Sequence, residues 1–257
     1  MAKTREVLTL AVEIGDLLLR NGAEVYRVED TVMHILKAYG IKNCDVYGLS
    51  NGIFASANEN TDDACSMIRH VPLGSVHLGR IAALNQLSRE LCAKECTIEE
   101  AWERIAQYKD IPTATKAVQI FFCGLGSGCF AYLFGGTALD GVIAFIVGAI
   151  LQVFLLEFKK QPSKFITNIL GSGLVTTLSL LFLTLGLPVL YDKIIIGAIM
   201  PLVPGIALTT SIRDLFNGDY VSGTIHLMDA LLTAFCIAVG VGTVITIYQY
   251  LPGGVIL

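Results

Sequence analysis

The sequence has 257 residues, is 54% apolar and has a mean hydropathy of +0.65. Soluble domains rarely reach this hydropathy, so the composition indicates a membrane protein rather than a soluble enzyme. The formal net charge is only −4 and no run of basic residues occurs, so nothing in the charge pattern indicates nucleic-acid binding.

The charges divide the chain into two parts. Residues 1–116 hold 13 of the 18 Lys and Arg residues and 16 of the 22 Asp and Glu residues, and residues 117–257 hold the remaining 5 and 6. Such a fall in the number of charged residues indicates that the first part is surrounded by water and the second by lipid. We therefore predict an α-helical membrane protein, with a small cytoplasmic α+β domain over residues 1–112 and a transmembrane domain over residues 117–257.

The first part shows the periodicities of a folded soluble domain. We expect helices near residues 5–20, 24–39, 78–94 and 98–109, and strands near 43–49, 52–58 and 64–71. The helices are predicted to flank a small antiparallel sheet. Thr97 and Glu100 have the spacing of a capping box at the start of the last helix.

Two cysteines of this part lie four residues apart on a predicted helix face, at Cys92 and Cys96. Two buried thiols are favoured over a metal site, because no second pair of Cys or His completes four ligands. No metal and no cofactor is expected. An odd number of cysteines without a secretory signal indicates reduced thiols in the cytoplasm.

Five apolar stretches in the second part are long enough to cross a bilayer. Each has about 20 residues, which matches a hydrocarbon core ~30 Å thick. We place the spans near residues 117–135, 139–158, 166–187, 193–212 and 228–250.

Positive charge lies mainly on one side of these spans. Lys116 precedes the first span, Lys159, Lys160 and Lys164 lie between the second and third, and Arg213 and His226 lie between the fourth and fifth. The other side carries only Lys193. The positive-inside rule therefore predicts a cytoplasmic N-terminus and a C-terminus, YLPGGVIL, outside the cell. Glycines within the spans, such as Gly124, Gly128 and Gly240, predict close helix packing.

The fourth predicted span contains two prolines and a glycine, Pro201, Pro204 and Gly205. Each proline removes a helix hydrogen bond, and freed carbonyls at membrane depth must face protein or a water-filled cavity. Discontinuous helices of this kind build substrate and ion sites in transporters. A simple proline kink is the alternative, and the motif alone does not decide between them.

The residues that follow favour the discontinuous helix. Thr209 and Thr210 place hydroxyls at membrane depth, and Arg213 and Asp214 are candidates to gate an inner mouth or carry coupled protons. Asp219 belongs to a cluster at the same end and also fits a capped helix terminus.

Few other polar residues lie inside the spans. Gln152 and Asn168 could face a common path near the inner side, but hydrogen bonds to neighbouring helices are slightly favoured for each. Asp140 and Asp229 lie at predicted span ends, where a water-facing position is favoured.

The segment from Gly22 to Thr31, GAEVYRVEDT, concentrates charge at a helix start. Glu24 places a negative charge at the positive, N-terminal end of the helix dipole, and it can pair with Arg27 three residues on. Glu29 follows in the same segment. No GxSxG, HExxH or P-loop pattern occurs, so a capped helix with a surface ion pair is favoured from chemistry alone.

Two segments, NGAEVYRVEDT and PGIALTTSIRDLFNGDYVSG, together resemble the threonine/serine exporter family, and the resemblance covers essentially the whole chain. Residues that carry over to the first motif are Gly22, Glu24, Arg27 and Glu29. Those that carry over to the second are Pro204, Gly205, Arg213, Asp214, Gly218 and Asp219.

The resemblance implies an exporter of small carboxylate metabolites in the cell inner membrane, driven by the proton gradient. Some family members combine two membrane halves in one chain. Others are split into a long chain and a short four-span membrane subunit, and split members are linked to dicarboxylate export, succinate in particular. One membrane half here implies the long subunit of such a pair, and a homo-oligomer is a further possibility.

Two other function classes compete with an exporter. A membrane-anchored enzyme or sensor would use the soluble domain and need only one or two spans. A purely structural membrane scaffold would have no reason to bury an interrupted helix.

Overall fold

The computed structural model describes residues 2–59, 61–72, 74, 76–158 and 163–250 of the chain. The predicted loop residues Lys159 and Lys160 and the C-terminal sequence from Leu251 lie outside the described residues. The chain forms two compact units, one of residues 1–113 and 210–226, the other of residues 114–209 and 227–257. The segment 210–226 thus groups with the N-terminal residues rather than with the apolar helices that flank it in sequence.

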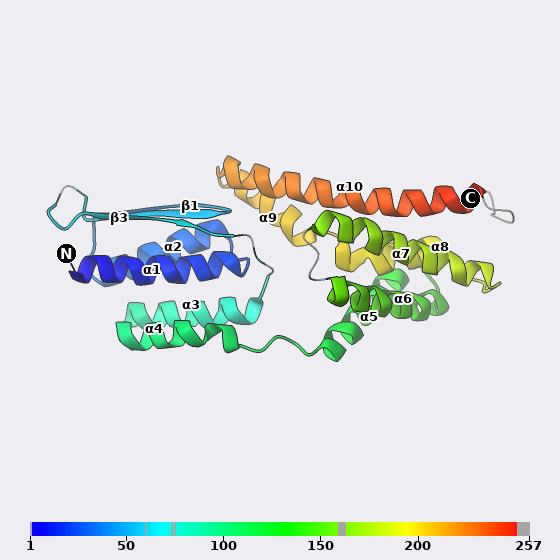
Figure 1. The fold of residues 1–257 in the computed structure, drawn as a ribbon, viewed down its shortest axis with the longest axis horizontal. Helices are drawn as coiled ribbons and strands as arrows, with labels where there is room; N and C mark the ends of the chain where they lie inside the picture. Colours follow the sequence, from blue (N-terminus) through cyan, green and yellow to red (C-terminus); the bar gives the residue numbers. More distant parts are fainter. Residues whose placement is uncertain (1, 60, 73, 75, 159–162, 251–257) are drawn as a thin grey trace. The chain divides into compact units, whose positions relative to one another are not determined.

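The first unit is an α+β fold (Figure 1). The helices of its N-terminal segment are α1 (Ala2–Arg20), α2 (Val25–Ala38), α3 (Leu78–Ala93), α4 (Ile98–Gln107) and the 3-10 turn η1 (Tyr108–Asp110). Its strands are β1 (Cys44–Leu49), β2 (Gly52–Ala57) and β3 (Cys65–His70). The strands form one antiparallel sheet in the order β1-β2-β3. The predicted elements are confirmed, and no end differs by more than three residues from the expected one.

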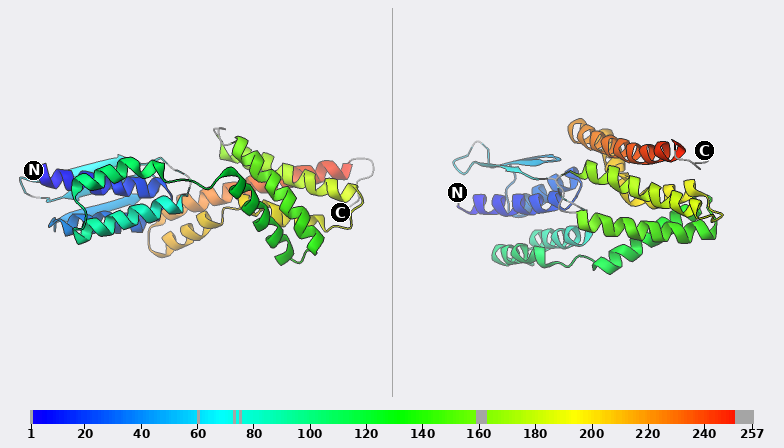
Figure 2. Two further views of the ribbon diagram at one scale, coloured as in Figure 1. Left: turned by 90° about the horizontal axis from the view of Figure 1, so that it is seen from below. Right: turned by 45° about the vertical axis from the view of Figure 1, so that its right-hand side comes forward.

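The unit is layered, with α1 and α2 between the sheet and the pair α3 and α4 (Figures 1 and 2). This position explains why both faces of α1 are apolar, and Leu10 and Ile14 are fully buried in it. Ile53 of β2 faces the same core, whereas Phe54 points away and is 39% exposed. The helices named here therefore pack on one face of the sheet, which is the arrangement usual for an α+β fold.

Two local predictions in this unit have different outcomes. Thr97 and Glu100 form the capping box, with Glu100 N–H donating to Thr97 Oγ1 at 3.2 Å and Thr97 N–H donating to Glu100 Oε2 at 2.9 Å. The shared helix face for Cys92 and Cys96 is wrong. Helix α3 ends at Ala93, and Lys94 adopts a left-handed conformation with φ of 57°, so Cys96 lies beyond the helix.

The apolar helices follow in chain order. They are α5 (Lys116–Leu133), α6 (Ala138–Glu157), α7 (Lys164–Thr184), α8 (Tyr191–Ile199), the 3-10 turn η3 (Met200–Leu202), α9 (Gly205–Phe216) and α10 (Tyr220–Tyr250). Among the described residues, four helices are long and apolar enough to cross a membrane, and a fifth span is reached if α8, η3 and α9 form one broken span. Helix α10 begins at Tyr220, eight residues before the predicted start of the last span near residue 228, so its first turns belong to the first unit.

Glycines in the second unit allow the backbones of neighbouring helices to pack closely. A Cβ on Gly128 of α5 would lie 2.6 Å from the Gly141 carbonyl oxygen of α6. A Cβ on Gly240 of α10 would lie 2.3 Å from the Ile169 carbonyl oxygen of α7. Without side chains at these points the helices gain dispersion contacts that lipid does not supply, which confirms the predicted close packing.

The expectation that Asp140 faces water is wrong, because Asp140 is fully buried. Its carboxylate accepts hydrogen bonds from Thr137 N–H at 2.7 Å and from Leu190 N–H at 2.9 Å, which offset the cost of burial. Asp229 of α10 forms an exposed ion pair with Lys164 of α7.

Candidate functional site

The N-terminal motif begins with a turn that only glycine fits well. Gly22 has φ of +84°, and a Cβ there would meet Val76 Cγ2 at 2.8 Å. This turn ends α1 and directs the chain into α2, whose N-cap residue is Glu24. The sequence break predicted at Gly22 is confirmed, and its role is to place the charged side chains that follow.

Glu24 and Arg27 form the predicted ion pair, with Arg27 Nε 2.8 Å from Glu24 Oε2. The N–H of Arg27 Nε is directed at the Tyr26 hydroxyl, to which it donates at 2.9 Å. The hydrogen bond to Tyr26 and the charge of Glu24 both raise the pKa of Arg27. The first turn of α2 therefore presents a carboxylate, a phenol and a guanidinium together.

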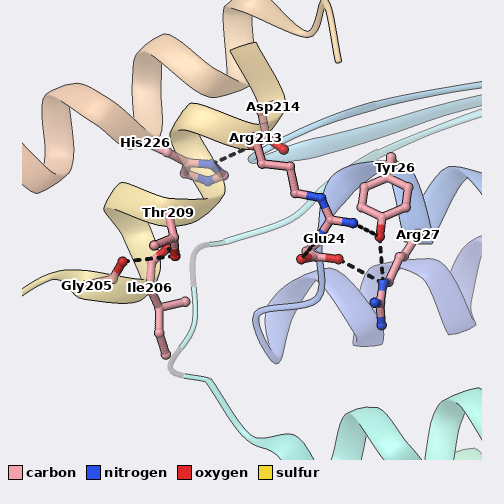
Figure 3. Close-up of polar contacts among 9 residues, drawn as sticks. All are labelled: Glu24, Tyr26, Arg27, Gly205, Ile206, Thr209, Arg213, Asp214 and His226. Carbon is pink, nitrogen blue, oxygen red and sulfur yellow. Dashed lines mark hydrogen bonds and ion pairs between the residues drawn. The ribbon is translucent and has the colours of Figure 1, made fainter. Parts of the chain in front are cut away.

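Arg213 of α9 joins this group from the second motif (Figure 3). One of its terminal nitrogens donates to Glu24 Oε1 and the other to the Tyr26 hydroxyl. Its guanidinium carbon also lies 4.6 Å from the centroid of the Tyr26 ring, within cation–π range. Both motifs thus meet within the first unit, and we call Glu24, Tyr26, Arg27 and Arg213 the arginine cluster.

The arginine cluster has an excess of positive charge. Two guanidinium groups share one carboxylate, so one positive charge is not balanced within the cluster. The Arg213 side chain is 43% exposed and the Arg27 side chain 59% exposed. The cluster can therefore attract a carboxylate from solvent, and a guanidinium can bind such a group through two parallel hydrogen bonds.

Asp214 follows Arg213 but points elsewhere. Its carboxylate oxygen lies 3.2 Å from His226 Nδ1 of α10, and Asp214 is only 5% exposed (Figure 3). The adjacent residues Arg213 and Asp214 therefore serve different partners, one in the N-terminal fold and one in α10. A buried carboxylate beside an imidazole is an arrangement suited to moving a proton near neutral pH.

Glu29 and Asp219 have local structural roles. Glu29 Oε1 accepts a hydrogen bond from Gly48 N–H at 2.7 Å, which ties α2 to β1. Burial raises the pKa of Glu29, and the charge of Asp219 adds to this effect. Asp219 Oδ1 accepts from Ser222 N–H at 3.3 Å and so caps the start of α10, after the turn at Gly218 with φ of +86°.

The prolines interrupt the fourth span as predicted. Helix α8 passes into η3 at Pro201, and the axis bends by 61° before α9 begins at Gly205, after Pro204. Val203 has an extended backbone between the two prolines. The alternative of a simple kink within a continuous helix is therefore wrong.

Thr209 hydrogen-bonds its own helix, donating to the Gly205 and Ile206 carbonyl oxygens, both at 3.0 Å. These carbonyls lie in the first turn of α9, so the Thr209 hydroxyl bonds back onto its own helix (Figure 3). Thr210 follows on the same helix and is half-buried.

The other predicted path residues are not brought into this cluster. Gln152 on α6 and Asn168 on α7 are half-buried in the second unit. Within the described residues, no group of three or more His, Cys, Asp and Glu side chains could hold a metal ion.

Two functional candidates were missed by sequence reasoning. Tyr26 lies inside the N-terminal motif, where its position between Glu24 and Arg27 is a usable signal. The sequence assigns His226 only to a basic loop, because its partner Asp214 is 12 residues away and hydropathy alone does not show that α10 extends back to Tyr220.

Comparison with known proteins bears on both motifs. The sequence profile of the threonine/serine exporter family matches residues 9–248. A curated relative named "Threonine/serine exporter", from Corynebacterium glutamicum, is 26% identical over 261 residues, which cover 95% of this chain and 52% of that protein. The chain thus spans about half the length of this relative. No solved structure matches the chain.

Proposed function

Because the chain belongs to the threonine/serine exporter family, we propose that it is one subunit of a membrane exporter of small carboxylate metabolites. The substrates are threonine and serine, or dicarboxylates such as succinate, and the proton gradient drives efflux. The observation that carries the proposal is the family match over residues 9–248 of a chain whose apolar helices include an interrupted one.

The interrupted helix supplies the physical basis for transport. A bend of 61° between α8 and α9 removes regular backbone hydrogen bonds at a depth where lipid offers none in return. An interruption of this kind is stable when it lines a polar passage, as in other secondary transporters. In this proposal Pro201, Pro204 and Gly205 shape the passage, and Thr209, Thr210, Gln152 and Asn168 contribute polar groups along it.

The arginine cluster explains a preference for carboxylates. Arg213 holds Glu24 in the absence of substrate, and a substrate carboxylate exchanges for Glu24 on the same guanidinium. The exchange replaces one charge-assisted hydrogen bond with another, so it has a small net cost. Asp214 and His226 handle the coupled proton at the same end of α9.

We extend the proposal to a short four-span membrane partner, as the family resemblance implies for members whose membrane parts are divided between two chains. The chain spans about half the length of the curated relative. We place the assembly in the cell inner membrane, with residues 1–113 and the segment 210–226 on the cytoplasmic side. The grouping of these two segments in one unit supports this arrangement, because one compact unit lies on one side of a membrane.

The test is efflux from cells preloaded with labelled threonine, serine or succinate. Cells carrying both this chain and its four-span partner should lose at least one substrate faster than cells lacking either. The control is a strain with both chains and the variant Arg5→Gln, a surface change in the first unit away from the cluster. Equal efflux of all three substrates with and without the two chains would defeat the proposal.

A further inference from the structure

A cavity separate from the interrupted helix lies in the first unit. Its volume is about 450 Å³, within the range of small-molecule sites, and its walls come from α2 and α3 only. Its polar walls include side chains from both helices: Arg27, Asp30, His34, Asn85, Ser88 and Arg89.

The charged side chains of the cavity are not all paired with a group of opposite charge. His34 Nδ1 lies 3.1 Å from Asp30 Oδ1, so a partner of opposite charge is available to Asp30 when His34 is protonated. Ser88 Oγ donates to the Asn85 carbonyl oxygen at 2.8 Å and keeps its acceptor capacity. Arg89 is exposed on α3, and no carboxylate pairs with it in the part of the chain that the structure describes. The cavity therefore offers a guanidinium without a counterion.

One wall of the cavity is also part of the arginine cluster. Tyr26 and Arg27 line the cavity, and both contact Glu24 or Arg213 on their other side. A ligand that draws the Arg27 side chain into the cavity weakens the ion pair between Arg27 and Glu24. Glu24 then interacts more strongly with Arg213, which leaves Arg213 less able to bind another carboxylate. Coupling of this kind is reciprocal, so Arg213 must also affect the ligand.

We propose that the cavity between α2 and α3 binds a small carboxylate through Arg89 and Arg27, and that this binding is coupled to the contact of Arg213 with Glu24 and Tyr26. It is a second site, distinct from the passage at the interrupted helix. Binding in the cavity does not depend on the export activity. Through its coupling to Arg213 the bound carboxylate would also regulate efflux, and this part of the proposal rests on the function proposed above. A free amino acid and a dicarboxylate share the group that Arg89 recognises, and the experiment separates them.

The test uses the purified full-length chain in detergent. Isothermal titration calorimetry with threonine, serine and succinate gives the affinity, and hydrogen exchange locates the bound ligand. For at least one of the three, we expect protection of residues 26–34 and 85–92. Arg89→Gln should weaken this binding about tenfold or more, since it removes a charge-assisted hydrogen bond. Arg5→Gln, the matched loss of a surface arginine in the same unit, should leave it unchanged.

The variant Arg213→Gln tests the coupling. Glu24 then pairs with Arg27 alone, so Arg27 is less available and the affinity should fall by a smaller factor than in Arg89→Gln. Equal affinity of Arg213→Gln and the unmodified chain would overturn the coupling. No binding of any of the three carboxylates, protection confined to α5–α10, or equal affinities of Arg89→Gln and Arg5→Gln would overturn the site. None of these results affects the efflux measurement in cells, so the two proposals can fail separately.

Discussion

At the residue scale, contacts within a helix turn were predictable from sequence and long-range contacts were not. The spacing of Glu24 and Arg27 was enough to predict their ion pair. The contact of Glu24 with Arg213 joins residues 189 positions apart, and no local pattern encodes it. Asp140 was placed in water because its second partner, the Leu190 N–H, is 50 positions away.

Glu29 gives a pH dependence with a defined sign. Burial raises its pKa above the ordinary value of 4.5, so the folded state holds the proton more tightly than the unfolded state. Stability is therefore lost as pH rises from about 4.5 through the folded pKa. Glu29→Gln keeps an acceptor for Gly48 N–H but cannot ionise, so its stability relative to the unmodified chain should be greater at pH 7 than at pH 4.

Thermal unfolding of the full chain in detergent at the two pH values measures this difference. Glu59→Gln, at an exposed glutamate in the same unit, is the control and should show no such trend. A Glu29→Gln effect of equal size at pH 4 and pH 7 would contradict the account.

The pair Asp214 and His226 predicts how efflux depends on the proton gradient. If this pair carries the coupled proton, Asp214→Asn and His226→Gln remove the titrating group and leave similar hydrogen-bonding shapes. Efflux in both variants should lose its dependence on an imposed pH gradient, although the protein still inserts. Labelled-substrate efflux at two external pH values checks this, and a gradient dependence equal to that of the unmodified chain would rule out the assignment.

At the element scale, the sequence predicted most helices because lipid imposes a simple length and hydropathy rule. The interruption at Pro201 and Pro204 was also predictable, because a proline disrupts a helix through contacts within its own turn. The apolar stretch near residues 228–250 does not show that α10 begins at Tyr220, because Ser222 and His226 lower the hydropathy of its first turns. In the fold Ser222 is fully buried and His226 pairs with Asp214, so these polar residues continue the helix instead of ending it.

The glycines of α5 allow a matched test of helix packing. A Cβ on Gly128 would lie 2.6 Å from the Gly141 carbonyl oxygen, whereas a Cβ on Gly126 has nothing within 4 Å. Gly128→Ala should therefore cost about 1–3 kcal/mol through overpacking. Gly126→Ala should be neutral or slightly stabilising, because alanine favours helix. Thermal unfolding in detergent compares the two, and equal destabilisation would refute the packing assigned to this face.

At the scale of the whole molecule, the assignment of residues 210–226 to the unit of residues 1–113 was the least predictable feature. Hydropathy treats that segment as a loop between two spans. The fold gives it partners in the N-terminal motif, through Arg213, so the two motifs that identify the family are also joined in space.

The proposed export requires that the interruption between α8 and α9 borders water rather than lipid. In a background without native cysteines, Ile206→Cys tests the start of α9 and Ile150→Cys tests an exposed apolar position on α6. A membrane-impermeant thiol reagent needs a hydrated thiolate to react. In cells that contain this chain and the proposed four-span partner, we expect modification at position 206, slowed by exported substrate, and none at position 150. A lack of reaction at both positions would contradict a water-filled passage at the interruption.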